Sequence, residues 1–145
     1  MEAHQLALSL PATPAAATAA RHHAVSAIAG WDAGLGTEVV RTAELLVSEL
    51  VTNAVQYADT GSVSLVVCLD EAVLRIEVCD TSPVLPKAAL PAADSEGGRG
   101  LFLVAALADR YRAEPTENGK RCWAEIDLPS KPSQDITCFL PLQRS

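Results

Sequence analysis

Aromatic residues and basic charge are both scarce in this sequence of 145 residues. Aromatics account for only 4% of it, and 11 Lys and Arg stand against 18 Asp and Glu, so that the formal net charge is -7. Proteins that bind the phosphate backbone of nucleic acids need a basic stripe or patch, and the sequence contains none. We therefore expect no nucleic-acid partner.

The sequence also lacks the signals of a membrane span, a signal peptide and a thiolate metal site. It has no apolar run of about 18 residues, and the segment Ala3–Ala20 lacks the positive n-region that begins a signal peptide. The cysteines show no CxxC spacing, and most of them fall in strand-like runs, where a free thiol acts as a small apolar group. They are Cys68, Cys79, Cys122 and Cys138. These absences predict a reduced, cytoplasmic protein with no membrane span and no metal bound at sulfur.

Hydrophobic residues, in contrast, are plentiful. They make up 49% of the chain, whose length suits one globular domain with a single core. No internal repeat is present, and the last 16 residues, 130–145, show no periodicity. We predict one domain over residues 1–129 and a flexible tail over residues 130–145.

The first part of the chain predicts one strand and two helices. Residues His4–Leu10 alternate apolar and polar side chains, as in a half-buried strand. An Ala-rich segment from about Thr13 to Ala29 predicts a helix that stops at Gly30. A longer helix is expected from Glu38 to about Tyr57, with Thr37 as its N-cap.

The second part predicts a hairpin, a long loop, a helix and a last strand. The runs GSVSLVVCLD and AVLRIEVCD are two strands joined by a tight turn at Asp70 and Glu71. The segment Thr81–Gly98 is rich in Pro, Ala and Gly without periodicity, which is typical of a long functional loop. GRGLFLVAALADRY then predicts an apolar helix, and KRCWAEIDLP predicts the final strand. This order predicts an α+β fold, a two-layer sandwich with helices on one face of a mostly antiparallel sheet.

The long helix carries two polar residues, Glu49 and Asn53, beside its apolar stripe. At about 100° per residue, Asn53 lies roughly 20° from Leu46 and Glu49 roughly 60° from it, at the edge of the buried face. The helix alone leaves two interpretations open, a functional pair or a solvated Glu beside a locally hydrogen-bonded Asn. The core-facing arc is predicted to comprise Val39, Ala43, Leu46, Leu50, Ala54 and Tyr57.

Asp80 ends a row of core-facing side chains. The alternation in LRIEVCD places Leu74, Ile76, Val78 and Asp80 on one face of the second hairpin strand. A buried, unpaired carboxylate is costly. Asp80 is therefore expected either to pair with a protein donor or to accept a hydrogen bond from a ligand.

A glycine cluster, EGGRGLFLV, stands before the apolar helix. Gly97, Gly98 and Gly100 precede the predicted helix, whose free N–H groups and positive dipole end suit a phosphate. On its own such a cluster is more typical of a flexible connector that caps a core helix.

Taken together, ELVTNA, DTSP and GGRGLFLV resemble the N box, G1 box and G2 box of the GHKL, or Bergerat-fold, ATPases. The likeness extends from about Leu6 to Leu128 and is greatest to the small anti-sigma factor serine kinases and their single-domain actinobacterial relatives. It implies the two-layer fold of this family, with ATP and Mg²⁺ as cofactors.

The resemblance also implies roles for individual residues. Glu49 would be the general base for the attacking hydroxyl, Asn53 the Mg²⁺ ligand, and Asp80 the acceptor for the exocyclic amine of adenine. The segment of Gly98, Arg99, Gly100 and Leu101 would contact the nucleotide, the glycines by letting the backbone approach the phosphates. Arg99 either neutralises phosphate charge or is a surface arginine. The loop Val84–Gly97 would close over the nucleotide as a lid.

Two departures from the family pattern leave two function classes open. Ser82 and Val84 stand where the G1 box commonly has glycines. The first class is an enzyme, an anti-sigma factor that phosphorylates serine or threonine on an anti-anti-sigma partner and regulates transcription by partner switching. The second is a non-catalytic, ATP-sensing or protein-binding regulator of the same fold. Retention of Glu49 and Asn53 favours the first class, and loss of the G1 glycines favours the second.

Partners are implied by the same resemblance. They are an anti-anti-sigma factor, a sigma factor or both, with a homodimer formed through the sheet side. Alternation in the last strand places Trp123 on its polar face. There it either anchors a partner or is a partly covered surface residue.

Overall fold

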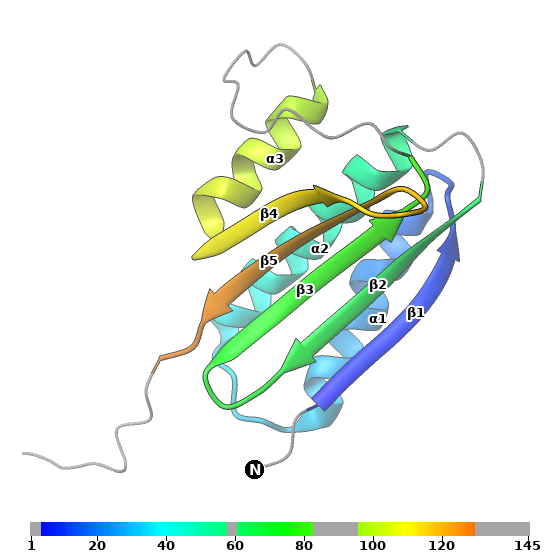
Figure 1. The fold of residues 1–145 in the computed structure, drawn as a ribbon. Coiled ribbons are helices and arrows are strands. Elements are labelled where there is room, and N and C mark those ends of the chain that lie inside the picture. The colour runs from blue at the N-terminus through cyan, green and yellow to red at the C-terminus, as the bar shows by residue number, and fades with distance from the viewer. Residues whose placement is uncertain (1–3, 58–60, 83–95, 130–145) are drawn as a thin grey trace, which may run out of the picture.

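In the described part of the chain, five antiparallel strands form one sheet in the order β1-β2-β3-β5-β4 (Figure 1). The structure, a computed structural model, describes residues 4–57, 61–82 and 96–129, and for residues 57 and 96–101 it describes the backbone alone. The strands are β1 (His4–Pro11), β2 (Ser62–Leu69), β3 (Val73–Asp80), β4 (Arg110–Pro115) and β5 (Lys120–Asp127). The predicted tail, residues 130–145, lies outside the described residues.

Among the described residues, three helices form the second layer, and Figure 1 shows α1 and α2 behind the sheet. Their bounds are α1 (Ala16–Trp31), α2 (Thr37–Tyr57) and α3 (Glu96–Leu107). Helix α1 packs on β1 and α2, helix α2 on the central strands β2, β3 and β5, and helix α3 on α2 and β4. The predicted α+β class with helices on one face of an antiparallel sheet is confirmed.

The core lies between the sheet and α2. Every second residue of β2, β3 and β5 is buried against the helices, as the pleat of a strand requires. From α2, Leu46, Leu50 and Ala54 are buried as predicted, and Val47 and Val51 widen the buried arc. The helix is thus held by a broad apolar face, which fixes the position of every polar residue beside it.

Two details of the fold differ from the sequence-based expectation. Helix α1 begins at Ala16 and continues through Gly30 to Trp31, because Asp32 adopts the left-handed conformation with φ 51° and its N–H donates to the carbonyl of Ala29. Strand β4 was not predicted, and the helix predicted to run through Tyr111 ends at Leu107. The strand RYRAEP is short and mostly polar, and among the described strands it pairs with β5 alone, at the edge of the sheet.

The hairpin turn at Asp70 is confirmed. The Oδ1 atom of Asp70 accepts hydrogen bonds from the N–H groups of Ala72 and Val73, at 3.0 and 2.9 Å. This turn pairs Leu69 with Leu74 and so sets the register of β2 and β3. The register in turn places Asp80 at the far end of β3 on the helix-facing side.

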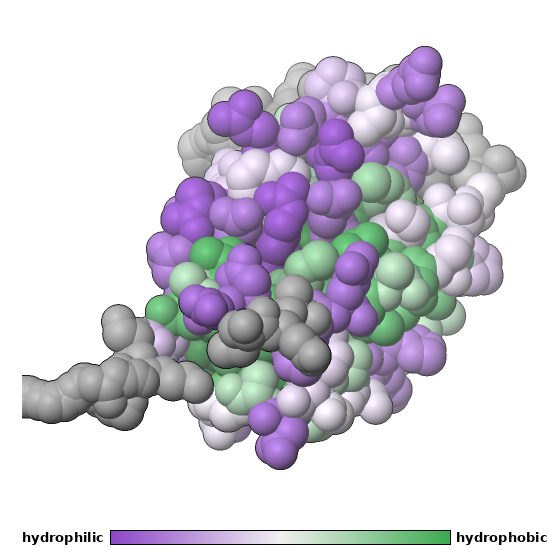
Figure 2. All heavy atoms as spheres, turned by 60° about the horizontal axis from the view of Figure 1, so that its bottom comes forward, coloured by the Kyte–Doolittle hydropathy of each residue, from purple (hydrophilic) through white to green (hydrophobic). Residues whose placement is uncertain are grey.

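The open face of β3, β5 and β4 carries a network of ion pairs. Arg75 binds Glu77 and Glu125 at 3.0 and 2.9 Å, and its guanidinium lies 4.2 Å from the ring centre of Trp123. The indole N–H of Trp123 donates to Glu114 at 3.0 Å. Trp123 is therefore a partly covered surface residue, the second of the two alternatives. In Figure 2, hydrophilic residues gather at the upper left of the visible surface and apolar residues toward its centre and right.

No helix in the described part of the chain is long and apolar enough to cross a membrane.

Candidate functional site

Asn53 is a buried amide without a hydrogen-bond partner in the described part of the chain. The apolar face of α2 carries it into the core, where it is 3% exposed. Neither its Oδ1 nor its Nδ2 atom has a hydrogen-bond partner among the described residues. A buried polar group left in this state costs about 1–3 kcal/mol, and most such groups in native proteins are bonded. An amide left unbonded within the described part of the chain is suited to a ligand that supplies the missing partners.

Glu49 lies one helical turn before Asn53 and is only partly buried. Burial raises the pKa of its carboxyl. No ion pair involves Glu49 within residues 4–57, 61–82 and 96–129. The neighbouring cation, Arg21 of α1, instead contacts Ser48 at 3.5 Å and Glu44 at 3.6 Å. A carboxylate with a raised pKa and no cationic partner is suited to accept a proton near neutral pH.

Asp80 ends β3 at 7% exposure and is paired with a protein donor. The ammonium of Lys120 lies 2.9 Å from Oδ2 and 3.1 Å from Oδ1, and the backbone N–H of Ser82 donates to Oδ1 at 2.8 Å. Lys120 itself is completely buried. Of the two partners expected for Asp80, the structure records a protein donor.

Lys120 and Gly119 were both missed by the sequence analysis. The signal for Lys120 was present, because alternation in KRCWAEI puts it on the same face as Cys122 and Ala124, which are buried. Gly119 sits in the turn from Thr116 to Gly119, in which the N–H of Thr116 donates to the carbonyl of Gly119 at 2.9 Å. A Cβ on Gly119 would come within 2.0 Å of the carbonyl oxygen of Asp80. Only glycine allows β5 to start so close to the end of β3.

The glycine cluster lies inside α3 and not before it. The helix begins at Glu96, so Gly97, Gly98 and Gly100 occupy its first turns together with Arg99 and Leu101. Glycine lowers helix stability by about 1 kcal/mol relative to Ala, which is why the sequence predicted a later start. The side chains of Arg99 and Leu101 are outside the described residues, as are residues 84–95 of the predicted lid Val84–Gly97.

The polar residues and the start of α3 converge in space. Figure 1 shows the C-terminal ends of α2 and β3 and the N-terminal end of α3 at the same end of the molecule. Helices α2 and α3 pack against each other. The part of α2 that carries Glu49 and Asn53, the end of β3 that carries Asp80, and the free N–H groups at the start of α3 therefore lie toward one end of the fold.

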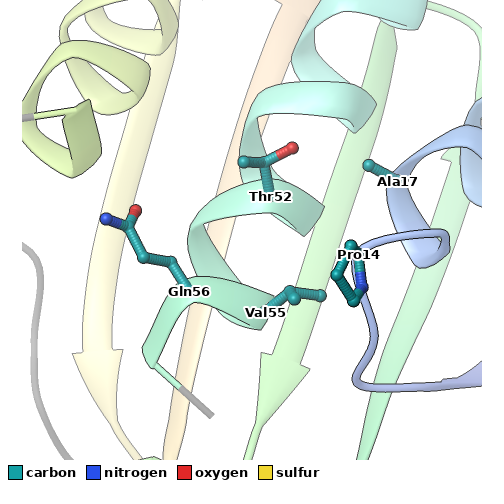
Figure 3. Close-up of a pocket in the computed structure, with 5 residues that line it drawn as sticks. All are labelled: Pro14, Ala17, Thr52, Val55 and Gln56. Atoms are coloured by element: carbon teal, nitrogen blue, oxygen red, sulfur yellow. The ribbon is translucent and has the colours of Figure 1, made fainter.

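A separate groove opens on the helix side (Figure 3). It has a volume of about 470 Å³ and lies between the segment before α1 and the last turns of α2. Its lining consists of Pro14, Ala17, Thr52, Val55 and Gln56. None of the predicted site residues lines this groove.

The described residues offer few ligands to a divalent cation. The described residues contain no group of three or more His, Cys, Asp and Glu that would hold a metal by themselves. Mg²⁺ is commonly held by one or two protein oxygens, with phosphates and water supplying the rest. The unbonded Oδ1 of Asn53 is such an oxygen, so the residues fit a Mg²⁺ that arrives with a nucleotide.

Comparison with known proteins agrees with the fold. The sequence model of the histidine kinase-like ATPase domain matches residues 10–125. Among solved structures, the crystal structure of the RsbU and RsbW domains of Rv1364c from Mycobacterium tuberculosis matches with a TM-score of 0.62 and 22% identity. The match covers 86% of this chain and 32% of the Rv1364c chain, so this chain spans about a third of the length of that one. No curated protein matches the sequence.

Proposed function

We propose that this chain, which belongs to the histidine kinase-like ATPase domain family, binds ATP and transfers its γ-phosphoryl group to a serine or threonine hydroxyl. The observation that carries the proposal is Asn53, a buried amide without a hydrogen-bond partner among the described residues, one helical turn from the partly buried Glu49. Its acceptor would be an anti-anti-sigma protein, and the chain would act as an anti-sigma factor that regulates transcription by partner switching.

In this proposal Glu49 is the general base. The hydroxyl oxygen forms a bond to the γ-phosphorus while the bond from that phosphorus to the β–γ bridging oxygen breaks, and ADP leaves. The hydroxyl proton passes to the Glu49 carboxylate. Burial raises the pKa of Glu49, which brings it closer to the working pH and makes it a more effective base.

Asn53 would orient the phosphates through a metal ion. Its Oδ1 would hold Mg²⁺, which when bound neutralises phosphate charge. Because the amide is fixed in the core by α2, it offers this oxygen without the entropy cost of ordering a mobile side chain. Glu49 would thus accept the proton, and Asn53 would bind the metal ion.

The base of the nucleotide would meet β3 and its phosphates the start of α3. Asp80 would accept the hydrogen bond of the adenine amine through Oδ2, whose one donor recorded among the described residues is Lys120. Of the predicted contacts Gly98, Arg99, Gly100 and Leu101, Gly98 lies in the first turn of α3, whose free N–H groups would face the phosphates, whereas the N–H groups of Gly100 and Leu101 belong to the helix's own hydrogen-bond ladder. In this arrangement the nucleotide would extend across one end of the fold, from its base at Asp80 to its phosphates at the start of α3.

A second candidate function is a non-catalytic regulator that senses ATP or binds a protein. The buried ion pair of Asp80 with Lys120 favours it, because a carboxylate already paired with an ammonium is a weaker acceptor for a base. Ser82 also favours the non-catalytic regulator. It is buried at 8% exposure, and its N–H is bonded to Asp80 at a position where the family pattern has a flexible glycine.

The partners are part of the proposal. An anti-anti-sigma factor, a sigma factor or both would bind in the cytoplasm, and a homodimer would use the open face of the sheet. On that face Trp123 is engaged by Arg75 and Glu114, so it would contribute as one member of a charged network and not as a free aromatic anchor.

Calorimetric titration of the full chain with ATP, with and without Mg²⁺, tests the proposal. We expect binding that tightens when Mg²⁺ is added, followed by phosphate transfer to candidate anti-anti-sigma proteins in a radiolabel assay. Binding without transfer to any of them would favour the regulator. Failure to bind at millimolar ATP would remove both nucleotide-dependent functions.

A further inference from the structure

Strand β1 forms one edge of the sheet, and its outer side is not protected by charge (Figure 1). Among the described strands it pairs with β2 alone. Edge strands of natural proteins commonly carry charged residues, which prevent pairing with another chain. The opposite edge strand, β4, follows this rule with Arg110, Arg112 and Glu114. Strand β1, HQLALSLP, contains no Asp, Glu, Lys or Arg, so its outer side suits a further strand.

The backbone groups that point away from β2 belong to Gln5, Ala7 and Ser9. The N–H of Ala12 donates to the carbonyl of Gly61 at 3.0 Å, which continues the register of β1 with β2. Since the direction of hydrogen bonding alternates along a strand, the even-numbered residues of β1 bond to β2 and the odd-numbered residues face outward. Gln5, Ala7 and Ser9 therefore offer their N–H and carbonyl groups to another strand, and all three residues are exposed.

Apolar side chains also reach this edge without being fully covered. On the helix side of β1, Leu6, Leu8 and Leu10 are only half-buried. In the neighbouring strand, Leu65, which pairs with Leu8, is completely buried. A strand added beyond β1 would cover these leucines, and the burial of their apolar surface would favour the pairing.

We propose that β1 pairs with β1 of a second copy of this chain, antiparallel and around a two-fold axis at Ala7. The outward-facing residues lie symmetrically about Ala7, so that Ala7 would face Ala7 of the second copy and Gln5 would face Ser9. Each such pair exchanges two N–H···O=C bonds, so the three pairs would form about six. A two-fold contact uses the same patch on both copies and therefore requires a strand that complements itself, as β1 does.

A second copy fits this edge better than a partner with a charged strand. On the helix side, Leu6 would pack against Leu8 of the second copy. On the open side, Gln5 would lie opposite Ser9, so that no like charges meet across the contact. A charged strand would find no Asp, Glu, Lys or Arg on β1 to pair with.

The inference goes beyond the proposed function and does not depend on nucleotide binding. It places the homodimer contact at the sheet edge and not on the open face, where Arg75 and Arg110 are already bound by Glu125. Salt distinguishes the two locations. Each copy has a formal net charge of -7, so screening of their repulsion should strengthen a contact between uncharged strands. A contact made of ion pairs should weaken instead.

Sedimentation equilibrium of the full chain at low and high salt tests the inference. We expect a monomer–dimer equilibrium that shifts toward the dimer as NaCl is added. Ala7→Pro removes the N–H group at the axis, and an edge strand tolerates proline where its N–H faces away from the sheet. The dissociation constant of the dimer should rise at least about tenfold, because two of its hydrogen bonds are lost.

Ala113→Pro is the matched control on the opposite edge. The N–H of Thr116 donates to the carbonyl of Gly119 at 2.9 Å, in register with the pairing of β4 and β5. The even-numbered residues of β4 therefore bond to β5, and the N–H of Ala113 faces outward as that of Ala7 does. This variant should dimerise like the parent.

Charged substitutions at Ala7 test the position of the axis. Ala7→Lys and Ala7→Glu each place two like charges opposite each other, so each variant alone should dimerise at least about tenfold more weakly than the parent. A mixture of the two variants places opposite charges across the axis and should restore the dimer. Because Ala7 is exposed, these variants still decide the question if Ala7→Pro fails to fold.

The results that would overturn the inference are distinct from those that bear on nucleotide chemistry. A parent chain that stays monomeric at every concentration would overturn it and leave the proposed function intact. A dimer that withstands Ala7→Pro and both charged variants lies on another surface, which also contradicts the inference. Failure to bind ATP would contradict the proposed function alone, since the strand pairing needs no nucleotide.

Discussion

Gly119 lies so close to Asp80 that a β-carbon on Gly119 would come within 2.0 Å of the Asp80 carbonyl oxygen. The same β-carbon would lie 2.6 Å from the Cα atom of Thr81. Because all of these neighbours are backbone atoms, a side chain at position 119 cannot be accommodated by a rotamer change. The turn between β4 and β5 is thereby linked to the acidic end of β3.

Gly119→Ala should displace the end of β3 and lower stability. Overpacking against a fixed backbone typically costs about 1–3 kcal/mol, which urea unfolding would measure. ATP affinity should fall as well, since Asp80 moves with its own carbonyl. Gly30→Ala is the control, because nothing lies within 4 Å of its β-carbon and it lies within α1. That variant should be slightly more stable than the parent.

Asp80→Asn should affect both folding and binding. It leaves the buried Lys120 ammonium without its counter-charge, and breaking a buried ion pair from one side costs about 3–5 kcal/mol. ATP binding should weaken by about one to two orders of magnitude, since a hydrogen bond to a charged group contributes about 1.5–3 kcal/mol. Titration under conditions where the variant remains folded separates the two effects. Unchanged ATP affinity would show that Asp80 serves the fold alone.

Glu49→Ala should reduce only the rate of phosphate transfer, whereas Asn53→Ala should reduce both nucleotide binding and the rate. Glu49→Ala should leave Mg·ATP binding nearly intact and slow serine phosphorylation by about 10²–10⁴-fold, roughly 3–5 kcal/mol of barrier. Asn53→Ala should lose Mg²⁺-dependent affinity as well as rate. Glu44→Ala, which removes another carboxylate of α2, is the matched control and should transfer phosphate at the parent rate. If Glu49→Ala also transfers at that rate, the kinase proposal is wrong.

Asn53→Leu should stabilise the protein in the absence of nucleotide. The substitution replaces an amide that has no hydrogen-bond partner in the described part of the chain with an apolar group of similar size. Removing the cost of the unsatisfied amide should raise the free energy of unfolding by about 1 kcal/mol or more. Urea unfolding without ATP measures this gain, and titration should show that Mg²⁺-dependent binding is lost. A clear loss of stability would mean that the amide has a structural partner.

Glu49→Gln should be more stable than the parent near neutral pH. Burial raises the pKa of Glu49 in the folded protein, so the neutral carboxyl favours folding at low pH and this contribution is lost as the pH rises through the folded pKa. Glutamine is neutral throughout, and the difference between the two proteins should therefore disappear below about pH 4. Unfolding curves across this range provide the test. Glu117→Gln, in the exposed turn between β4 and β5, is the control.

The sequence predicted most of the candidate site because its positions depend on local periodicity. The 3.6-residue repeat of α2 placed Glu49 and Asn53 beside the apolar stripe, and the two-residue repeat of β3 placed Asp80 on the buried face. It did not predict β4, whose polar residues become a strand only through pairing with β5. It also underestimated how deeply Asn53 is buried, because the neighbouring Val47 and Val51 widen the core face of the helix.

By itself the sequence determined which side chains point inward, since the direction of each side chain follows from the geometry of a single helix or strand. It also determined the family, through short motifs whose spacing does not depend on long-range contacts. Only the tertiary structure decided which inward groups meet. Asp80 and Lys120 stand 40 residues apart, and their contact depends on the register of β3 with β5. That register results from packing both strands under α2, a long-range effect that no local pattern encodes.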